Sequence, residues 1–340
     1  MNDTNMKNKR NPIIGITIGD PAGIGPEICV EALMEEEVYK KCRPVLIGCS
    51  GTIKKAMDIK KCNFKLNVIS NPSEGKFEIG TIDLIETGEY DFQSIEYGEV
   101  QALAGQMAYD AIAKGTLLAK NKEIDILDTA PINKEAIKLI GIKEAGHTEI
   151  IKELTESKYA LTMFNCHKLR VFFLSRHLSL RNACDYITKE RVLENIKLIN
   201  EEITAIGIEN PKIAVAALNP HGSDNGLFGN EEKEALIPAI LEAKELGINA
   251  MGPVPADSVF HLGKSGIYDA ILSLYHDQGH IACKTFDFDK TISLTLGLPF
   301  LRASVDHGTA FDIAGKNLAQ AISMVESVIV SCDYWNLMNK

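Results

Sequence analysis

Three short apolar segments, each followed by a histidine, constrain the fold of this 340-residue chain more than any other feature of its sequence. Their length and their polar or glycine-containing borders are typical of buried strands. In an open α/β sheet, ligands bind beyond the carboxyl ends of the strands, so imidazoles placed there can converge on one metal ion. The segments and their histidines are residues 171–174 with His177, 213–218 with His221, and 270–275 with His276.

Three imidazoles indicate a reactive metal site rather than a structural one. Neutral imidazole is a suitable ligand for zinc, cobalt and similar ions. Because three neutral ligands leave the full +2 charge on the ion, it can act as a Lewis acid with open positions. Any one of these histidines taken alone would more commonly be structural, and it is their shared position after the strands that indicates the site.

The composition argues against several classes of protein. A net charge of −10 disfavours nucleic acid or an anionic membrane as the main partner, and there is no apolar run of the length that a membrane span needs. The eight cysteines include no C-x-x-C pair, which argues against a disulfide scaffold or zinc ribbon and suits a reducing cytoplasm. Residues 1–12 are predicted to be a disordered tail, because the N-terminal segment is polar and lacks the apolar core of a signal peptide.

Predicted strands alternate with predicted helices along the chain, which favours an α/β protein with a largely parallel sheet. Near the N-terminus, a strand at 13–18 leads through the glycine-rich residues 19–25 into a helix that begins at Pro26. The loop matches neither G-x-G-x-x-G nor the Walker sequence, so it is either an anion or cofactor site or a tight turn. Small residues between 98 and 120 predict a helix that packs closely against a neighbour.

Charged residues near the predicted site are candidates for binding an anionic substrate and for orienting the histidines. A phosphate ester carries a charge of about −1.5 to −2 at neutral pH, which lysine and arginine side chains can bind. A carboxylate beside a metal-binding histidine can accept its second N–H. For each of these residues the alternative is an ordinary surface charge, a turn or a helix cap. The cationic candidates are Lys134, Lys284 and Arg302, and the acidic candidates are Asp257, Asp277 and Asp306.

Several longer stretches together resemble the 4-hydroxythreonine-4-phosphate dehydrogenase family. The resemblance implies an isocitrate/isopropylmalate dehydrogenase-like α/β fold, with two α/β/α domains and a cleft between them. The expected first domain is 13–145 plus 303–340, and the expected second domain, which carries the metal histidines, is 146–302. The matching stretches are residues 19–27 (GDPAGIGPE), 146–149 (GHTE), 219–221 (NPH), 275–279 (YHDQG), 296–300 (LGLPF) and 304–309 (SVDHGT).

Within that family, three features are more similar to the branch that acts on 4-phospho-D-threonate or 4-phospho-D-erythronate than to the vitamin B6 branch. They are residues 129–136, residues 225–229 and His280. Two departures from the family pattern bear on the substrate. The family usually has asparagine where this chain has Ser293, and residues 220–225 replace a more usual Ala-Gly-Glu sequence after the histidine.

The resemblance also implies roles for individual residues. His177, His221 and His276 would bind a divalent metal (zinc, cobalt, magnesium or manganese) and, with Lys284, would be catalytic. The enzyme would be a cytoplasmic homodimer that binds NAD in the interdomain cleft, with metal ligands from both chains at the subunit interface. The expected substrate contacts are His147, Thr148, Lys284, Ser293 and Arg302, and the expected cofactor contacts are Gly297, Leu298, Pro299, Asp306, Gly308 and Thr309.

The reaction that the resemblance implies is an NAD-dependent oxidation at C3 of a 4-phosphorylated 3-hydroxy acid, followed by decarboxylation to dihydroxyacetone phosphate. The first alternative is the 4-hydroxythreonine-4-phosphate dehydrogenase of pyridoxal phosphate biosynthesis. More distant alternatives are a metal-dependent hydrolase or acyltransferase and a non-catalytic ligand-binding protein. The sequence shows neither a carboxylate-rich two-metal site nor a serine nucleophile elbow, which speaks against the hydrolase.

Overall fold

The chain folds into two compact units in a computed structural model that describes residues 10–143 and 146–340. Each unit is an α/β structure with its own strands, helices and buried apolar residues, and each is described by itself below. Unit 1 comprises the chain up to Lys158 and Leu298–Trp335, and unit 2 comprises Tyr159–Gly297 and Asn336–Lys340.

Apolar packing explains why these divisions differ from those expected at 145/146 and 302/303. Ile150 and Ile151 are buried in the core of unit 1, although they follow residue 145. Leu298 and Phe300 pack against the same core, although they precede residue 303. The segments on either side of unit 2 therefore belong to unit 1.

The sheet of unit 1 is parallel, with the strand order β3-β4-β2-β1-β5-β12. Its central strand β1 is β-branched and fully buried, as expected of a strand covered on both faces. Asp125 accepts 2.8 Å hydrogen bonds from the Arg10 guanidinium and from the Ile13 N–H, which fixes the entry to β1. Of the expected tail 1–12, residues 1–9 lie outside the described residues. The strands are β1 (Ile13–Thr17), β2 (Arg43–Gly48), β3 (Lys65–Ile69), β4 (Thr81–Glu86), β5 (Ile126–Thr129) and β12 (Leu301–Val305).

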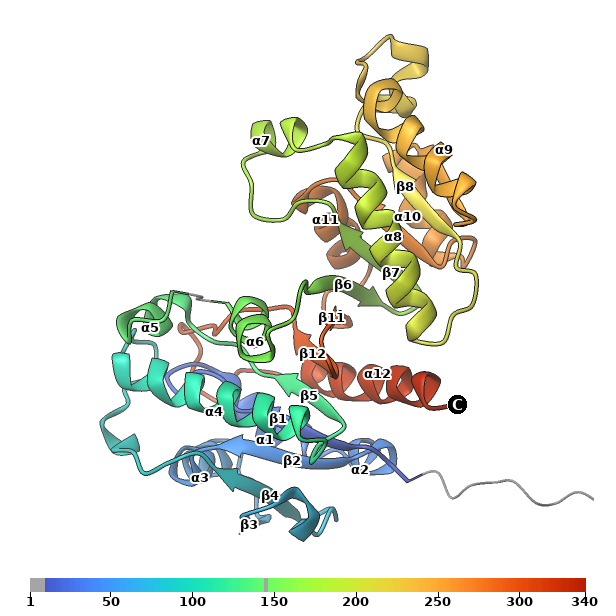
Figure 1. The fold of residues 1–340 in the computed structure, drawn as a ribbon. Coiled ribbons are helices and arrows are strands. Elements are labelled where there is room, and N and C mark those ends of the chain that lie inside the picture. The colour runs from blue at the N-terminus through green and yellow to red at the C-terminus, as the bar shows by residue number, and fades with distance from the viewer. Residues whose placement is uncertain (1–9, 144–145) are drawn as a thin grey trace, which may run out of the picture. The chain divides into compact units, whose positions relative to one another are not determined.

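Helices cover both faces of this sheet (Figure 1). Residues of α1, α3 and α12 share one apolar cluster with the strands, and residues of α4, α5 and α6 share another. The helical segments are α1 (Gly25–Ala32), α2 (Glu36–Lys41), α3 (Ser50–Ile59), η1 (Pro72–Glu74), η2 (Phe92–Ser94), α4 (Ala102–Lys120), α5 (Lys134–Leu139), α6 (His147–Thr155) and α12 (Ile322–Met338).

The strands of unit 2 lie in the order β11-β6-β7-β10-β8-β9. The pairs from β7 to β9 are parallel, whereas β6 pairs antiparallel with both β11 and β7. The two units thus confirm the predicted α/β class with largely parallel strands. The strands are β6 (Leu161–Cys166), β7 (Leu169–Phe173), β8 (Ile213–Ala216), β9 (Ala250–Val254), β10 (Ala270–Ser273) and β11 (Thr291–Leu296).

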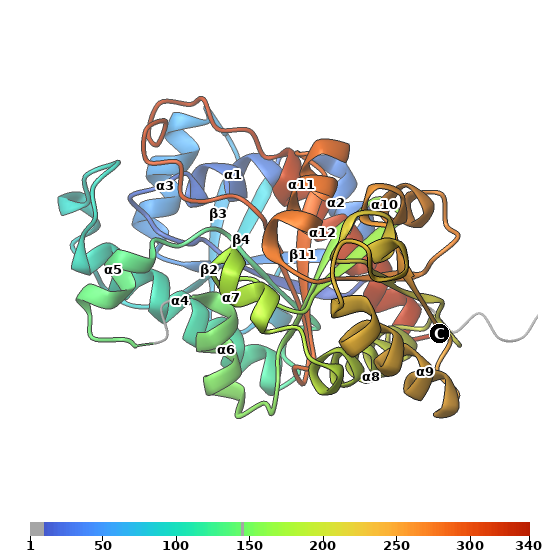
Figure 2. The same ribbon diagram turned by 90° about the horizontal axis from the view of Figure 1, so that it is seen from above.

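Helices α10 and α11 lie on one side of the unit 2 strands and α8 and α9 on the other (Figure 2). Val259 of α10 and Cys283 of α11 belong to the apolar cluster formed with β6, β7, β8 and β10. The helical segments are α7 (Leu180–Asp185), α8 (Lys189–Ala205), η3 (Pro220–Gly226), η4 (Glu232–Leu236), α9 (Ile237–Glu245), α10 (Ala256–Lys264) and α11 (His276–Phe286).

The last helix, α12, begins at Ile322. The positive φ of Gly315 (76°) and of Asn317 (56°) keeps the chain before it in turns. The predicted close packing of the helix near 98–120 is present. A Cβ added at Gly105 of α4 would lie 2.2 Å from the carbonyl oxygen of Ala136 in α5, so α4 and α5 meet there at the backbone.

We expect Gly105→Ala to destabilise the protein by about 1–3 kcal/mol, because the added methyl group meets backbone atoms that cannot rotate away. Urea unfolding followed by circular dichroism measures the change. Gly308→Ala is the matched control, since a Cβ there meets nothing within 4 Å. Equal stabilities of the two variants would contradict the close α4–α5 contact.

Candidate functional site

The three predicted histidines follow three neighbouring parallel strands of unit 2. Strand β10 lies between β7 and β8, and all three run in the same direction. His177 follows β7, His221 follows β8 and His276 follows β10. The carboxyl ends of these strands meet at one edge of the sheet, so the structure confirms the placement that the sequence predicts.

His276 is the first residue of α11, and the carboxylate beside it sets its tautomer. The Asp277 Oδ1 atom lies 2.6 Å from His276 Nδ1. With the Nδ1 proton donated to this carboxylate, Nε2 carries the lone pair that a metal ion can bind. This hydrogen bond is the contact that an orienting role of Asp277 requires, and the role itself stays a prediction.

Gln278 joins the ends of two of the histidine-bearing strands. Its Oε1 accepts a 2.8 Å hydrogen bond from the Leu274 N–H after β10, and its Nε2 donates a 2.8 Å hydrogen bond to the Ala217 carbonyl after β8. Sequence reasoning placed Gln278 within a motif but assigned it no role. Gln278 directly follows His276 and Asp277, which have predicted roles. That position, together with its amide group, is the signal that could have indicated a role for Gln278.

His221 lies in a left-handed loop that a buried carboxylate holds. Residues 221–225 all have positive φ, which is uncommon for residues other than glycine. Glu232, only 2% exposed, accepts hydrogen bonds from the Leu218 N–H (2.9 Å) and from the Asn219 N–H and Nδ2 (both 2.8 Å). Glu232 begins η4, a π-helical turn of a kind that is frequent at functional sites.

His177 is exposed. The chain that leads to it from β7 stays hydrogen-bonded to the chain after β10, beyond the last residues of the two strands. The Leu174 N–H donates a 2.8 Å hydrogen bond to the Ser273 carbonyl, and Ser175 Oγ donates a 3.0 Å hydrogen bond to the Leu274 carbonyl. These bonds fix the backbone up to two residues before His177.

The three histidines share this edge, but they are not gathered as ligands of one ion. Among residues 10–143 and 146–340, no three His, Cys, Asp or Glu side chains are grouped so that they could hold a metal. The donors nevertheless fit a divalent metal in their chemistry, because imidazole is a suitable ligand and Asp277 holds His276 with Nε2 available.

Lys284 and Ser293 lie on the same side of the unit 2 sheet as His276. Lys284 is eight residues after His276 in α11, which places the two on one face of the helix. Ser293 of β11 is opposite Phe164 of β6, and the Phe164 ring packs 4.3 Å from that of His280 in α11. Side chains directly opposite in an antiparallel pair share a face.

A second group of predicted residues lies in unit 1, around a buried arginine. Arg302 of β12 is 4% exposed, and its Nη2 donates a 2.6 Å hydrogen bond to Thr129 Oγ1. Its Nη1 lies 3.4 Å from Thr148 Oγ1. Thr148 lies in the first turn of α6, whose N-cap is Gly146, and no side chain caps the helix. The Thr148 hydroxyl instead faces the guanidinium.

His147, the first residue of α6, adds a buried nitrogen to this cluster. Its Nε2 is buried and has no hydrogen-bond partner among the described residues. The ring also hydrogen-bonds the backbone of Ala130, and because Nε2 has no partner, that bond is made at Nδ1. Burial, followed by the charges of Arg302 and Lys134, holds the pKa of His147 well below its usual value of 6.5.

The chemistry of these residues suits an anion, with a neutral acceptor beside it. The buried guanidinium and the Lys134 ammonium favour a carboxylate or phosphate, and the Thr148 hydroxyl can donate to one. The neutral His147 Nε2 can accept a hydrogen bond from a ligand hydroxyl. The structure thus brings together His147, Thr148 and Arg302, and adds Lys134 and Thr129, the latter not predicted as a contact.

The glycine loop 19–25 is a tight turn rather than an open anion site. A Cβ at Gly25 would lie 2.3 Å from the Ile18 carbonyl oxygen, and one at Gly23 would lie 2.8 Å from that of Thr309. The Ile24 N–H donates a 3.0 Å hydrogen bond to the Thr309 carbonyl. The loop is buried and supports the segment that contains Thr309, so close packing explains its glycines.

The two segments predicted to contact the cofactor, 297–299 and 306–309, make packing contacts and hydrogen bonds within the protein. The Gly297 N–H donates a 3.1 Å hydrogen bond to Glu202 in unit 2, and Leu298 packs in the unit 1 core. Downstream, the Gly315 N–H donates a 2.7 Å hydrogen bond to the buried carboxylate of Glu27. The Glu202 contact holds the backbone of the segment at 297–299, and the Ile24 N–H holds the segment at 306–309 through the Thr309 carbonyl. A role of either segment in NAD binding stays a prediction.

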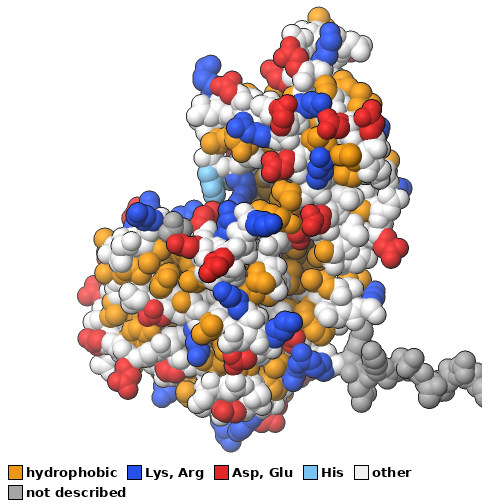
Figure 3. All heavy atoms as spheres, viewed as in Figure 1, with side chains coloured by type: hydrophobic (Ala, Val, Ile, Leu, Met, Phe, Trp, Pro, Cys, Tyr) orange, Lys and Arg blue, Asp and Glu red, His pale blue; other side chains and the backbone are white. Residues whose placement is uncertain are grey.

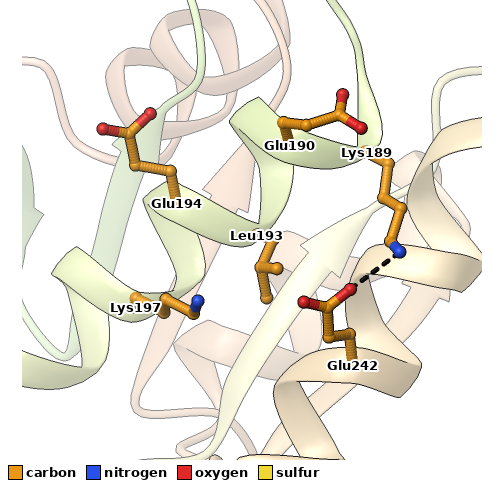
Figure 4. A pocket seen from close by; sticks show the side chains of 6 residues that line it. All are labelled: Lys189, Glu190, Leu193, Glu194, Lys197 and Glu242. Atoms are coloured by element: carbon orange, nitrogen blue, oxygen red, sulfur yellow. Dashed lines mark ion pairs between the residues drawn. The ribbon is translucent and has the colours of Figure 1, made fainter.

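A hollow of about 420 Å³ between α8 and α9 lies away from the predicted site residues. It is lined by Leu193 and by charged side chains, with a 2.7 Å ion pair between Lys189 and Glu242 (Figure 4). Such exposed pairs contribute little to stability. On the face shown in Figure 3, basic and acidic side chains are interspersed. Within the described residues, the helices are too short or too polar to span a bilayer.

Comparison with known proteins gives a family over most of the chain. The profile described as "Pyridoxal phosphate biosynthetic protein PdxA" matches residues 40–331. A Clostridium botulinum protein named "Putative D-threonate 4-phosphate dehydrogenase" is 52% identical over 323 residues, 95% of this chain and 97% of the relative. A Halalkalibacterium halodurans protein of the same name is 49% identical over 325 residues, 96% of this chain and 97% of the relative.

Solved structures show the same fold. The 4-hydroxythreonine-4-phosphate dehydrogenase of Klebsiella pneumoniae superposes with a TM-score of 0.89 at 37% identity, over 96% of this chain and 100% of that one. A Burkholderia phymatum protein described in the same words gives a TM-score of 0.84 at 38% identity, over 96% and 99% of the two chains.

We expect Glu232→Ala to loosen the loop that carries His221, because three N–H groups lose their buried acceptor. The cost would be on the order of 3 kcal/mol. Hydrogen–deuterium exchange of residues 218–226 measures the loosening. The control is Glu231→Gln, since the Glu231 carboxylate accepts from a side chain, Asn219 Nδ2 (2.7 Å), and not from the backbone of the described loop. Equally fast exchange in the two variants would contradict this role of Glu232.

The lowered pKa of His147 predicts a loss of stability in acid. Below pH 6.5 His147 is protonated in the unfolded chain but not in the folded protein. Its contribution to the free energy of unfolding is therefore present above pH 6.5 and is lost as the pH falls. The slope approaches about 1.4 kcal/mol per pH unit. Urea unfolding between pH 7.5 and 5.5 should show a shallower loss for His147→Asn than for the wild type. Parallel curves would refute the burial of a neutral imidazole.

Proposed function

Because the chain belongs to the PdxA family, we propose that it is an NAD-dependent dehydrogenase that oxidises C3 of a 4-phosphorylated 3-hydroxy acid and then decarboxylates it. We propose 4-phospho-D-threonate or 4-phospho-D-erythronate as the substrate and dihydroxyacetone phosphate as the product. The observation that carries the proposal is the position of His177, His221 and His276 after three adjacent parallel strands. The names of relatives about 50% identical over nearly the whole chain support the choice of substrate.

The edge of the unit 2 sheet where His177, His221 and His276 lie would bind a divalent metal, with zinc, cobalt, magnesium and manganese as candidates. When bound, such an ion supplies Lewis-acid chemistry to the oxygen at C3. His276 would present Nε2, since Asp277 binds its Nδ1, and Glu232 would hold the loop that presents His221. Lys284, on the α11 face that carries His276, would bind an anionic group of the substrate.

The cluster around Arg302 in unit 1 would bind the carboxylate or phosphate of the substrate. The buried guanidinium is held in place by Thr129, so it requires little reorganisation when an anion arrives. His147 would accept a hydrogen bond from a substrate hydroxyl through its neutral Nε2, beside the hydroxyl of Thr148. These contacts would orient C3 for hydride transfer.

The proposed reaction is an oxidation at C3 followed by a decarboxylation. The C3–H hydrogen leaves as hydride to NAD, and the C3 hydroxyl loses its proton. The product is a β-keto acid, which loses its carboxyl group as CO₂. The enol that remains is protonated at C2 to give dihydroxyacetone phosphate. The segments around Gly297 and Gly308 would contact NAD, and the active form would be a cytoplasmic homodimer to which both chains supply metal ligands.

A second candidate is the oxidation of 4-hydroxythreonine 4-phosphate, which the solved structures favour. Two structures that cover 96% of this chain carry that enzyme's name, at 37–38% identity. This substrate has an ammonium group at C2 where the sugar acids have a hydroxyl. The chemistry at C3 is the same, so only a direct comparison of substrates separates the two.

The test is to incubate the purified protein with zinc and NAD and each of the three phosphorylated substrates, and to follow absorbance at 340 nm. We expect the highest kcat/KM with threonate or erythronate 4-phosphate. A higher value with 4-hydroxythreonine 4-phosphate would select the second candidate. His221→Ala should lose bound zinc and activity together, and an active, metal-free variant would refute the metal assignment.

A further inference from the structure

His280 is at the centre of an aromatic group in unit 2 that also includes His276. Its ring lies 3.6 Å from that of His276 between centroids, with an interplanar angle of 11°, so the two rings are stacked. Phe164 and Phe173 contact the His280 ring at 4.3 Å and 4.4 Å. The two phenylalanine rings also contact each other edge to face at 5.0 Å.

The orientation of the His280 ring is fixed by a hydrogen bond as well as by packing. Its Nδ1 lies 2.8 Å from the carbonyl oxygen of His276, four residues earlier in α11, so Nδ1 carries the proton and donates it. The phenylalanine rings restrict the ring from the side of the sheet. The half-buried imidazole of His280 is therefore held both by a hydrogen bond and by aromatic packing.

His276 needs such support because its own surroundings are open. Its side chain is 45% exposed, and its Nδ1 is hydrogen-bonded to Asp277, whose side chain is 70% exposed. A hydrogen bond to an exposed carboxylate does not by itself fix the plane of an imidazole ring. The flat face of His280 restricts the plane of the ring.

We propose that His280 is a positioning residue that holds the His276 imidazole in the plane in which Asp277 binds Nδ1 and Nε2 faces a metal. This inference rests on the proposed function of His276 as a ligand. His280 would act through His276 and would not itself touch the metal or substrate.

The same group of rings connects two of the proposed ligands. Phe173 is the last residue of β7, four residues before His177, and Phe164 of β6 pairs with Val171 of β7. The ring of His280 therefore links the first turn of α11 to the end of the strand that delivers His177. Loss of this ring would affect the direction of His276 first, because that contact is the closest.

The test compares His280→Phe, which keeps an aromatic face, with His280→Leu, which fills space but cannot stack. Zinc affinity is measured by competition with a chromophoric chelator. We expect His280→Leu to weaken binding about tenfold or more, as loss of support for a ligand usually does. His280→Phe should stay within about threefold of the wild type. His261→Leu, on α10, is the control for the same change at a histidine with no proposed role, and should bind zinc like the wild type.

Equal zinc affinities of the Phe and Leu variants would overturn the proposal, since packing alone would then explain His280. His276→Ala separates this outcome from failure of the proposed function, because unchanged zinc binding in that variant would show that His276 is not a ligand. A second readout needs no metal. Nitrogen-15 spectra of the imidazoles should show His276 as one Nδ1–H tautomer in the wild type and as a mixture in His280→Leu. Identical spectra would also overturn the proposal.

Discussion

The parallel alignment of β7, β10 and β8 is the constraint on which the rest of the proposed site depends. Because the three strands run side by side in one direction, residues after their last hydrogen-bonded pairs emerge at one edge. Backbone pairing alone does not fix the loops beyond that edge. The side chains of Gln278 and Glu232 do so, by satisfying backbone groups that the sheet leaves unpaired.

The two units contribute different chemistry. Unit 2 provides imidazoles whose neutral nitrogen atoms suit a divalent ion, and Asp277 selects the nitrogen that His276 presents. Unit 1 provides a buried guanidinium held by Thr129, next to an imidazole kept neutral by burial. The substrate that we propose has a hydroxyl, which suits the first kind of chemistry, and two anionic groups, which suit the second. The net charge of the whole chain is −10, so attraction of an anion has to be local.

Sequence reasoning could predict what is encoded locally. The apolar runs before His177, His221 and His276 are strands, and the small residues near Gly105 do mark a close helix contact. It could not predict that β10 separates β7 from β8, because strand order depends on long crossovers. The hydrogen bond between Arg302 and Thr129 joins residues 173 positions apart, and no local sequence pattern indicates it. The spacing of the glycine loop 19–25 fits both an anion site and a tight turn. The atoms packed against the loop decide for the tight turn.

The most direct test of the account is the anomalous scattering of a crystal of the full-length protein grown with zinc. The account predicts a zinc peak about 2.0–2.1 Å from Nε2 of His276 and at the same distance from a ring nitrogen of His177 and of His221, supplied by one copy of the chain or by two. Zinc bound at other residues, with these three imidazoles unligated, would contradict it.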